Sequence, residues 1–141
     1  MAFLFDTDAI SEVLRHQPLT EYMEWLHTLP RDEQFTSSIV IGELYKGAYR
    51  SPARERHLDH IKKRILPAVT VLPYDVATAN IYGQIRAKLE ETGQILADAD
   101  LQIAATALYH GLDLVTGNLR HFRRIDGLRI NKILSQARQS R

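Results

Sequence analysis

The sequence predicts an α/β protein with a central parallel sheet, and three observations support this fold class. Short apolar runs alternate with longer segments that have helical periodicity. Between Ile95 and Phe122, Asp98 is expected to cap a helix that ends at Gly111, and a short buried strand follows over residues 112–116. An acid also follows the first apolar run directly, at the strand end where open α/β sheets bind ligands.

Each further element has its own local signal. The pattern predicts strands over residues 2–5, 33–37, 69–72 and 128–130, and helices over residues 8–14, 18–29, 38 to about 47, 51–65 and 75–92. Ser38, Ser51 and Asp75 are the expected N-terminal residues of three of these helices, with Pro52 at a first helical position. We expect one domain over residues 1–141, with a basic C-terminal tail from about residue 133.

Composition limits the class of protein. The chain has 141 residues, 45% of them hydrophobic and 25% charged, which is typical of a soluble domain. It contains no cysteine, so a metal would be held by oxygen or by histidine. No apolar run is long enough to cross a bilayer, and an acid at position 6 comes too early for a signal peptide. We therefore expect a cytoplasmic protein with no membrane partner.

The net charge of +1 says little, but positive charge is concentrated after Val115. Only Asp126 is acidic in that segment, whose basic residues are Arg120, Arg123, Arg124, Arg129, Lys132, Arg138 and Arg141. The segment either contacts a phosphate backbone or is a solvated tail, and the sequence leaves both open.

Three acids are predicted at one edge of the sheet. Asp6 follows the first strand, whereas Asp8 is expected to cap the next helix. Glu43 and Asp100 each continue the apolar stripe of a helix near its start, so both point inward. Asp98 is close to Asp100 and is either a helix cap or a further ligand.

Such a cluster of carboxylates predicts a metal site. Like charges in a partly buried cleft repel one another, and no Lys or Arg lies within two residues of Asp6, Glu43 or Asp100 to neutralise them. Oxygen ligands favour Mg²⁺ or Mn²⁺, and ions held in this way suit the hydrolysis of phosphodiesters. Thr7, Thr116 and Asn118 are expected at the same edge, where they would orient ligands or water.

The segments FLFDTDAIS, IVIGELYKGA and ADADLQIAATALYHGLDLVTGNLRHF resemble those of the PIN-domain ribonucleases, and most closely the VapC-type toxins. The resemblance covers nearly the whole chain, including YGQIRAKLEETGQIL. It implies that the metal-binding acids are Asp6, Glu43 and Asp100. The family often has a further acid where this chain has Asn118, which puts a second metal in doubt.

The resemblance also implies the fold and the partners. It implies an α/β/α sandwich, a homodimer, and Mg²⁺- or Mn²⁺-dependent cleavage of RNA, with a transfer RNA such as the initiator species as the expected substrate. A VapB-type antitoxin would inhibit the toxin by covering the acidic cleft, in a higher assembly. Arg86, Arg120, Arg123 and Arg124 are candidate RNA contacts.

Two other functions remain open from the sequence. Asp6 and Asp8 also resemble the acids of haloacid-dehalogenase phosphatases, in which Asp6 would be the nucleophile. That family expects Thr or Val where this chain has Ile10, and a Lys at a later strand end. Alternatively, the chain is a non-catalytic module that binds RNA or protein and whose acids are structural.

Overall fold

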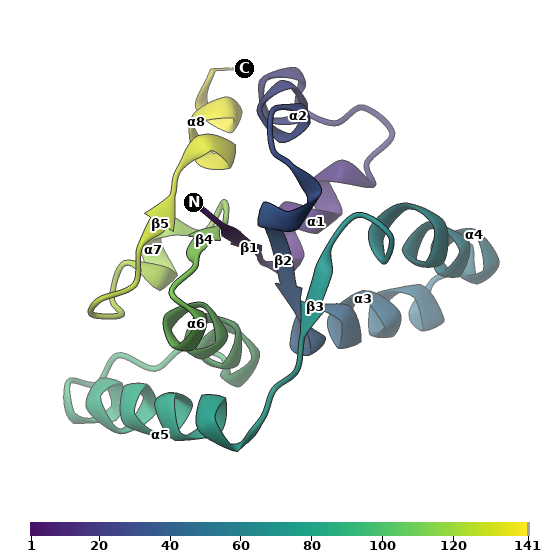
Figure 1. The fold of residues 1–141 in the computed structure, drawn as a ribbon. Helices are drawn as coiled ribbons and strands as arrows, with labels where there is room; N and C mark the ends of the chain where they lie inside the picture. Colours follow the sequence, from purple (N-terminus) through teal and green to yellow (C-terminus); the bar gives the residue numbers. More distant parts are fainter. Residues whose placement is uncertain (141) are drawn as a thin grey trace.

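Within residues 1–140, which this computed structural model describes, five parallel strands form one sheet in the order β3-β2-β1-β4-β5 (Figure 1). The strands are β1 (Phe3–Phe5), β2 (Gln34–Ser37), β3 (Thr70–Leu72), β4 (Asp113–Val115) and β5 (Ile130–Asn131). The helices are α1 (Thr7–Val13), α2 (Thr20–His27), α3 (Ser38–Arg50), α4 (Arg54–His60), α5 (Val76–Glu91), α6 (Asp98–His110), α7 (Leu119–Phe122) and α8 (Ile133–Gln139). A 3₁₀ turn, η1 (Arg31–Glu33), precedes β2, and a π-helical turn, η2 (Ile61–Ile65), continues α4. The predicted α/β class with a parallel sheet is confirmed.

The strand order reverses beside β1. The chain builds outward from β1 to β2 and β3, and then crosses to β4 on the other side of β1. Phe3 lies opposite Gln34 of β2, and Phe5 lies opposite Val115 of β4. In open α/β sheets, ligands bind at the carboxyl ends of the strands where the order reverses. That position lies between the ends of β1 and β4.

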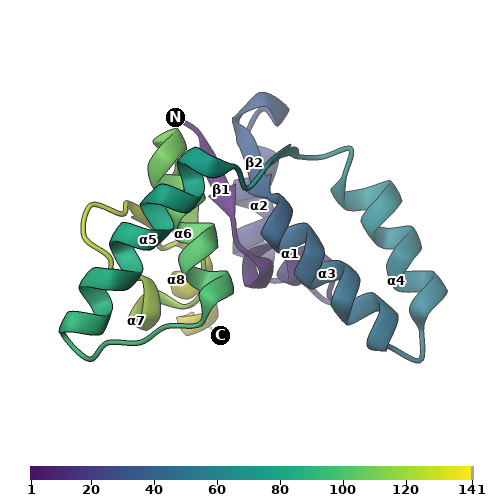
Figure 2. The same cartoon turned by 90° about the horizontal axis from the view of Figure 1, so that it is seen from below.

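Helices cover both faces of the sheet. Helices α5 and α6 pack side by side, α4 lies beside α3, and α3 also contacts α1, while α2 packs against α8 (Figures 1 and 2). Leu4 and Leu114 are fully buried at the centre of the sheet, and Ala104 of α6 packs in the same core. The predicted left-handed end of α6 is present, because Gly111 has φ 66°. No helix in residues 1–140 is long and apolar enough to cross a membrane.

Two predicted helix starts are displaced. Ser37, not Ser38, caps α3, and its hydroxyl accepts hydrogen bonds from the N–H groups of Ile39 and Val40. Ser51 does not cap α4, which begins at Arg54. Its hydroxyl accepts from the N–H of Ala53 at 3.0 Å, so it stabilises the turn before the helix. Asp75 caps α5 as predicted, by accepting from the N–H of Thr78.

The C-terminal segment differs most from the sequence-based expectation. Its residues 133–139 form α8, with Leu134 and Ala137 buried, where a basic tail was expected. The short helix α7 was not predicted, and the edge strand is Ile130–Asn131 in place of residues 128–130. Arg141 lies outside the described residues.

Candidate active site

Asp6 follows β1 and caps α1. Its N–H donates to the carbonyl of Val115 at 3.2 Å, which continues the sheet by one residue. Its Oδ1 then accepts from the N–H of Ala9 at 2.8 Å. The prediction that Asp8 caps this helix is therefore wrong, because Asp8 is already inside the first turn. The end of β1 and the start of α1 together fix the position of the Asp6 carboxylate.

The Asp6 side chain is almost completely buried, with 5% of the residue exposed. Burial raises the pKa of this carboxyl to about 7, and the nearby charges of Asp8 and Asp100 act in the same direction. Hydrogen bonds from the Thr116 hydroxyl and the Ala9 N–H oppose this rise. No Lys or Arg within residues 1–140 forms an ion pair with Asp6. A buried acid of this kind favours either a bound proton or a bound cation.

Glu43 lies in the second turn of α3, which the Ser37 cap places just after β2. Its Oε1 accepts a hydrogen bond from the hydroxyl of Thr7, the first residue of α1. The side chain therefore faces the end of β1 across the helix boundary, as its position on the apolar stripe of α3 predicts.

Asp100 lies in the first turn of α6 and is partly buried. Burial and the charge of Glu43 raise the pKa of its carboxyl, whereas His121 lowers it. Nδ1 of His121 is 3.8 Å from Oδ2 of Asp100 and 2.8 Å from the side-chain nitrogen of Asn118. Asn118 itself donates its N–H to the hydroxyl of Thr116 at 2.9 Å. The loop that follows Val115, whose carbonyl bonds to the Asp6 N–H, thus leads to His121 beside Asp100.

Asp98 does not cap α6, contrary to the sequence-based expectation. Ala97 occupies the cap position, and no side chain there bonds to the helix N–H groups. The Asp98 carboxylate instead pairs with Arg86 of α5 and accepts from the Tyr82 hydroxyl at 2.6 Å. Its side chain is 61% exposed. Asp98 thus joins α6 to α5 through an exposed ion pair.

The three inward-facing acids have a donor set that fits a hard divalent cation. Asp100 is close enough to both Asp6 and Glu43 to raise a pKa within each pair. Their oxygens are the ligands that Mg²⁺ and Mn²⁺ prefer, and no Lys or Arg of the described chain pairs with any of them. Within residues 1–140 no group of three or more Asp, Glu or His side chains is arranged closely enough to hold a metal ion between them.

Sequence reasoning missed the network that surrounds Asp8. Arg138 of α8 makes two hydrogen bonds to the Asp8 carboxylate, at 2.8 and 2.9 Å, and a third to Glu12 at 3.1 Å. The Glu12 side chain is fully buried and also accepts from Arg15 and from the N–H of Leu19. Asp8 and Glu12 are four residues apart and share one face of α1, which is the only local signal for a common partner.

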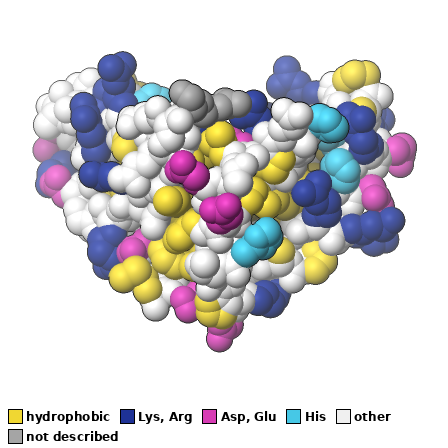
Figure 3. Space-filling model, turned by 90° about the horizontal axis from the view of Figure 1, so that it is seen from above, with side chains coloured by type: hydrophobic (Ala, Val, Ile, Leu, Met, Phe, Trp, Pro, Cys, Tyr) yellow, Lys and Arg dark blue, Asp and Glu magenta, His cyan; other side chains and the backbone are white. Residues whose placement is uncertain are grey.

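The candidate RNA contacts are in different situations. Arg86 is engaged by Asp98 and Glu90. Arg120 and Arg123 are exposed and Arg124 is half-buried, all three in or just after α7, which begins directly after Asn118. Elsewhere on the surface, Lys and Arg side chains gather over α4, at the right of Figure 3.

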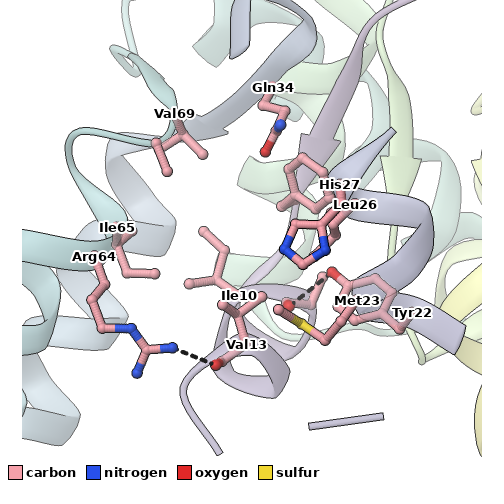
Figure 4. A pocket seen from close by; sticks show the side chains of 13 residues that line it. Ile10, Val13, Tyr22, Met23, Leu26, His27, Gln34, Arg64, Ile65 and Val69 are labelled. Atoms are coloured by element: carbon pink, nitrogen blue, oxygen red, sulfur yellow. Dashed lines mark hydrogen bonds between the residues drawn. The ribbon is translucent and has the colours of Figure 1, made fainter. Parts of the chain in front are cut away.

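Two hollows lie near α1. One, of about 440 Å³, lies between α1, α3 and α4 and has Thr7 and Glu43 in its wall. The other, of about 250 Å³, is lined mainly by apolar side chains, including Ile10, Met23 and Val69 (Figure 4). The three acids are absent from the lining of the second pocket, so only the first adjoins the candidate site.

Comparison with known proteins agrees with this geometry. The family model of the PIN domain matches residues 3–128. The tRNA(fMet)-specific endonuclease VapC of Salmonella typhimurium is 36% identical over 130 residues, which are 92% of this chain and 96% of that protein. Toxin FitB of Neisseria gonorrhoeae is 37% identical over 124 residues, 84% of this chain and 89% of that protein.

A solved structure supports the same assignment. The crystal structure of DNA-bound VapBC from Salmonella typhimurium aligns with a TM-score of 0.86 and 35% identity, over 93% of this chain and 97% of that one. These matches favour the PIN domain over the haloacid-dehalogenase alternative. The sheet order, the acids at its carboxyl edge and the match over most of its length establish that the chain belongs to the PIN-domain family.

Proposed function

We propose that this protein is the toxin of a type II toxin-antitoxin pair and acts as a metal-dependent endoribonuclease. One observation carries the proposal. Asp6, Glu43 and Asp100 come from β1, α3 and α6, and they face one another without an ion pair to Lys or Arg in residues 1–140. Holding such charges together costs folding free energy, which a bound cation would offset.

The chemistry follows from the donor set. Asp6, Glu43 and Asp100 would hold Mg²⁺ or Mn²⁺, which when bound lowers the pKa of an attacking water and stabilises negative charge on a phosphodiester. The hydroxyl of Thr7 orients Glu43, and the N–H of Ala9 orients Asp6. The Asp6 carboxylate accepts from Ala9 through Oδ1 and keeps further lone pairs for a ligand.

The proposed substrate is a transfer RNA, with the initiator species as the first candidate. The Salmonella relative is named for cleavage of tRNA(fMet), and it matches 92% of this chain. Arg120, Arg123 and Arg124 adjoin the site through α7 and are the proposed phosphate contacts there. Arg86 is a weaker candidate, because Asp98 and Glu90 already engage its guanidinium.

The proposed protein partner is a VapB-type antitoxin. The similar solved structure is of a VapBC complex, and a second relative is named as a toxin. We expect the antitoxin to inhibit cleavage by covering the acidic cleft, and the toxin to form a homodimer. Both expectations rest on the resemblance to the family.

Cleavage of a purified total transfer-RNA pool by antitoxin-free protein tests the function. We expect discrete cuts in Mg²⁺ or Mn²⁺ and none in EDTA, with the new ends mapped by sequencing. Asp100→Asn should abolish the cuts while circular dichroism and thermal unfolding show a folded protein. Asp126→Asn is the matched control, because that exposed acid pairs with Lys88 away from the site.

The outcomes separate the functions. Metal-dependent cuts that Asp100→Asn abolishes support the nuclease. If neither transfer RNA nor ribosomal RNA is cut, but wild type and Asp100→Asn both bind RNA, the protein is instead a non-catalytic binding module.

A further inference from the structure

The site residues are connected to α8 by a partly buried charge network that the proposed chemistry does not use directly. Arg138 is 130 residues from Asp8 along the chain, and its guanidinium holds that carboxylate with two hydrogen bonds. Such a fork against a carboxylate fixes both partners in one plane, which a Lys cannot do. The third bond, to the buried Glu12, ties the same guanidinium to the next turn of α1.

The Arg138–Asp8 pair also lies against the loop after β4. A Cβ added at Gly117 would be 2.5 Å from Oδ2 of Asp8 and closer still to the guanidinium of Arg138. The backbone of Gly117 therefore rests on this pair, and no side chain fits between them. Gly117 joins Thr116, which follows the Val115 carbonyl that accepts from the Asp6 N–H, to Asn118, which contacts His121 beside Asp100.

The first turn of α1 and the loop after β4 thus meet at one guanidinium. Asp8 lies in the first turn of α1, the turn that Asp6 caps. The Asp8 charge also acts on Asp6, and Arg138 supplies the opposite charge beside it. We propose that Arg138 is a positioning residue of the proposed nuclease, which sets the first turn of α1 and the Thr116–Asn118 loop relative to each other. This inference rests on the proposed function.

A positioning role makes a different prediction from a purely structural one. Mutating a residue that supports the ligands of a metal site typically lowers activity or metal affinity by about 10- to 100-fold. Arg138→Gln should therefore lower the single-turnover cleavage rate at saturating protein by about tenfold or more. The protein concentration that gives half the maximal rate should change less than about twofold, since Arg138 pairs with acids and is not a proposed phosphate contact.

The experiment uses the full chain, the total transfer-RNA pool and Mn²⁺, at a temperature where every variant is folded. Calorimetric titration with Mn²⁺ alone gives a second readout, in which Arg138→Gln should bind about tenfold more weakly. Arg129→Gln is the matched control. Arg129 also pairs with a carboxylate and a carbonyl, those of Asp113 and Gly111, but at the opposite edge of the sheet. This control should keep the wild-type rate and Mn²⁺ affinity.

A second variant reaches the same contact from the loop. Gly117→Ala leaves α8 unchanged and pushes its new methyl group against the Arg138–Asp8 pair. It should lower the cleavage rate at saturating protein as Arg138→Gln does. The double variant should lose less activity than the product of the two separate fold-reductions in rate. The Gly117→Ala variant also keeps the inference testable if Arg138→Gln does not fold.

Several results would overturn the inference. Either variant could lower the unfolding temperature while it keeps the wild-type rate at saturating protein and the wild-type Mn²⁺ affinity. That result would assign α8 a purely structural role. Fully multiplicative effects of the two changes would show that they do not act through one contact. If the wild-type protein does not cut RNA, both the proposed function and the positioning role are wrong. If the folded variants cut RNA at the wild-type rate, only the positioning role is wrong.

Discussion

The hydroxyl of Thr7 donates a hydrogen bond to Oε1 of Glu43, a residue 36 positions further along the chain. Thr7 is the first residue of α1, and it follows Asp6 directly. One dipeptide therefore supplies a candidate ligand and the hydrogen bond that orients a second one. The bond joins the start of α1, just after β1, to α3, and both residues line the 440 Å³ hollow.

Thr7→Val tests the importance of this bond. Valine keeps the β-branched shape and removes the hydroxyl, so Glu43 loses its fixed orientation while the helix start is preserved. We expect the cleavage rate in Mg²⁺ to fall by roughly tenfold, with the unfolding temperature nearly unchanged. Single-turnover cleavage of the transfer-RNA pool measures the effect.

Thr7→Ser is the control, because it restores the donor. If Thr7→Val cleaves at the wild-type rate, the orientation of Glu43 by Thr7 has no part in the reaction. If Thr7→Ser is as slow as Thr7→Val, the lost methyl group rather than the hydroxyl explains the effect.

Asp6→Asn should stabilise the metal-free protein at high pH. Burial raises the pKa of Asp6 from 3.8 to about 7, so between these values the folded protein keeps a proton that the unfolded chain has lost. Wild-type stability therefore falls as the pH rises from about 4 to about 7 and stays low above that. Asparagine is about as good a helix cap as aspartate, so the variant keeps the α1 cap without the buried charge.

Urea unfolding in EDTA at pH 5 and pH 8 measures this difference. At pH 8 Asp6→Asn should be more stable by on the order of a few kcal/mol, and the gain should shrink at pH 5. Excess Mg²⁺ should then stabilise wild type more than the variant. If Asp6→Asn is less stable than wild type at pH 8, burial of the charged Asp6 carboxylate does not destabilise the folded protein.

The central part of the fold was predictable because its signals are local. The apolar run before Asp6 and the helix ending at Gly111, followed by β4, follow from residues next to one another in the sequence. The meeting of Asp6 and Thr116 then follows from parallel pairing, because Phe5 lies opposite Val115. The metal-binding roles of Asp6, Glu43 and Asp100 stay predictions.

The sequence-based predictions were wrong where a residue's structure depends on a partner that is distant in the sequence. Asp is a common helix cap, but Asp8 and Asp98 both lie inside the first turns of their helices, and their carboxylates pair with Arg138 and Arg86. The segment expected to be a basic tail is helical because Leu134 and Ala137 pack into the core and Arg138 reaches α1. No local pattern could identify a partner 130 residues away.

Asp98→Asn should have little effect. Removing a true helix cap would cost about 1 kcal/mol. The structure shows an exposed pair with Arg86 instead, and exposed ion pairs contribute little to stability. We expect nearly unchanged urea unfolding and a wild-type cleavage rate. A large loss of cleavage in the folded variant would make Asp98 a ligand after all.

Asn118→Asp should strengthen metal binding. The side chain of Asn118 is next to His121, which approaches Asp100, so a carboxylate there would add a fourth acid to the cluster. Extra ligand charge raises the affinity of an oxygen site for a divalent cation. We expect Mn²⁺ titration to show tighter binding or a second bound ion, together with lower stability in EDTA because another like charge has joined the site.

Asn131→Asp is the matched control, since Asn131 accepts from the N–H of Ile133 at the end of β5. If Asn118→Asp binds Mn²⁺ no better than wild type and no better than this control, position 118 does not face the metal, and the site is complete with Asp6, Glu43 and Asp100.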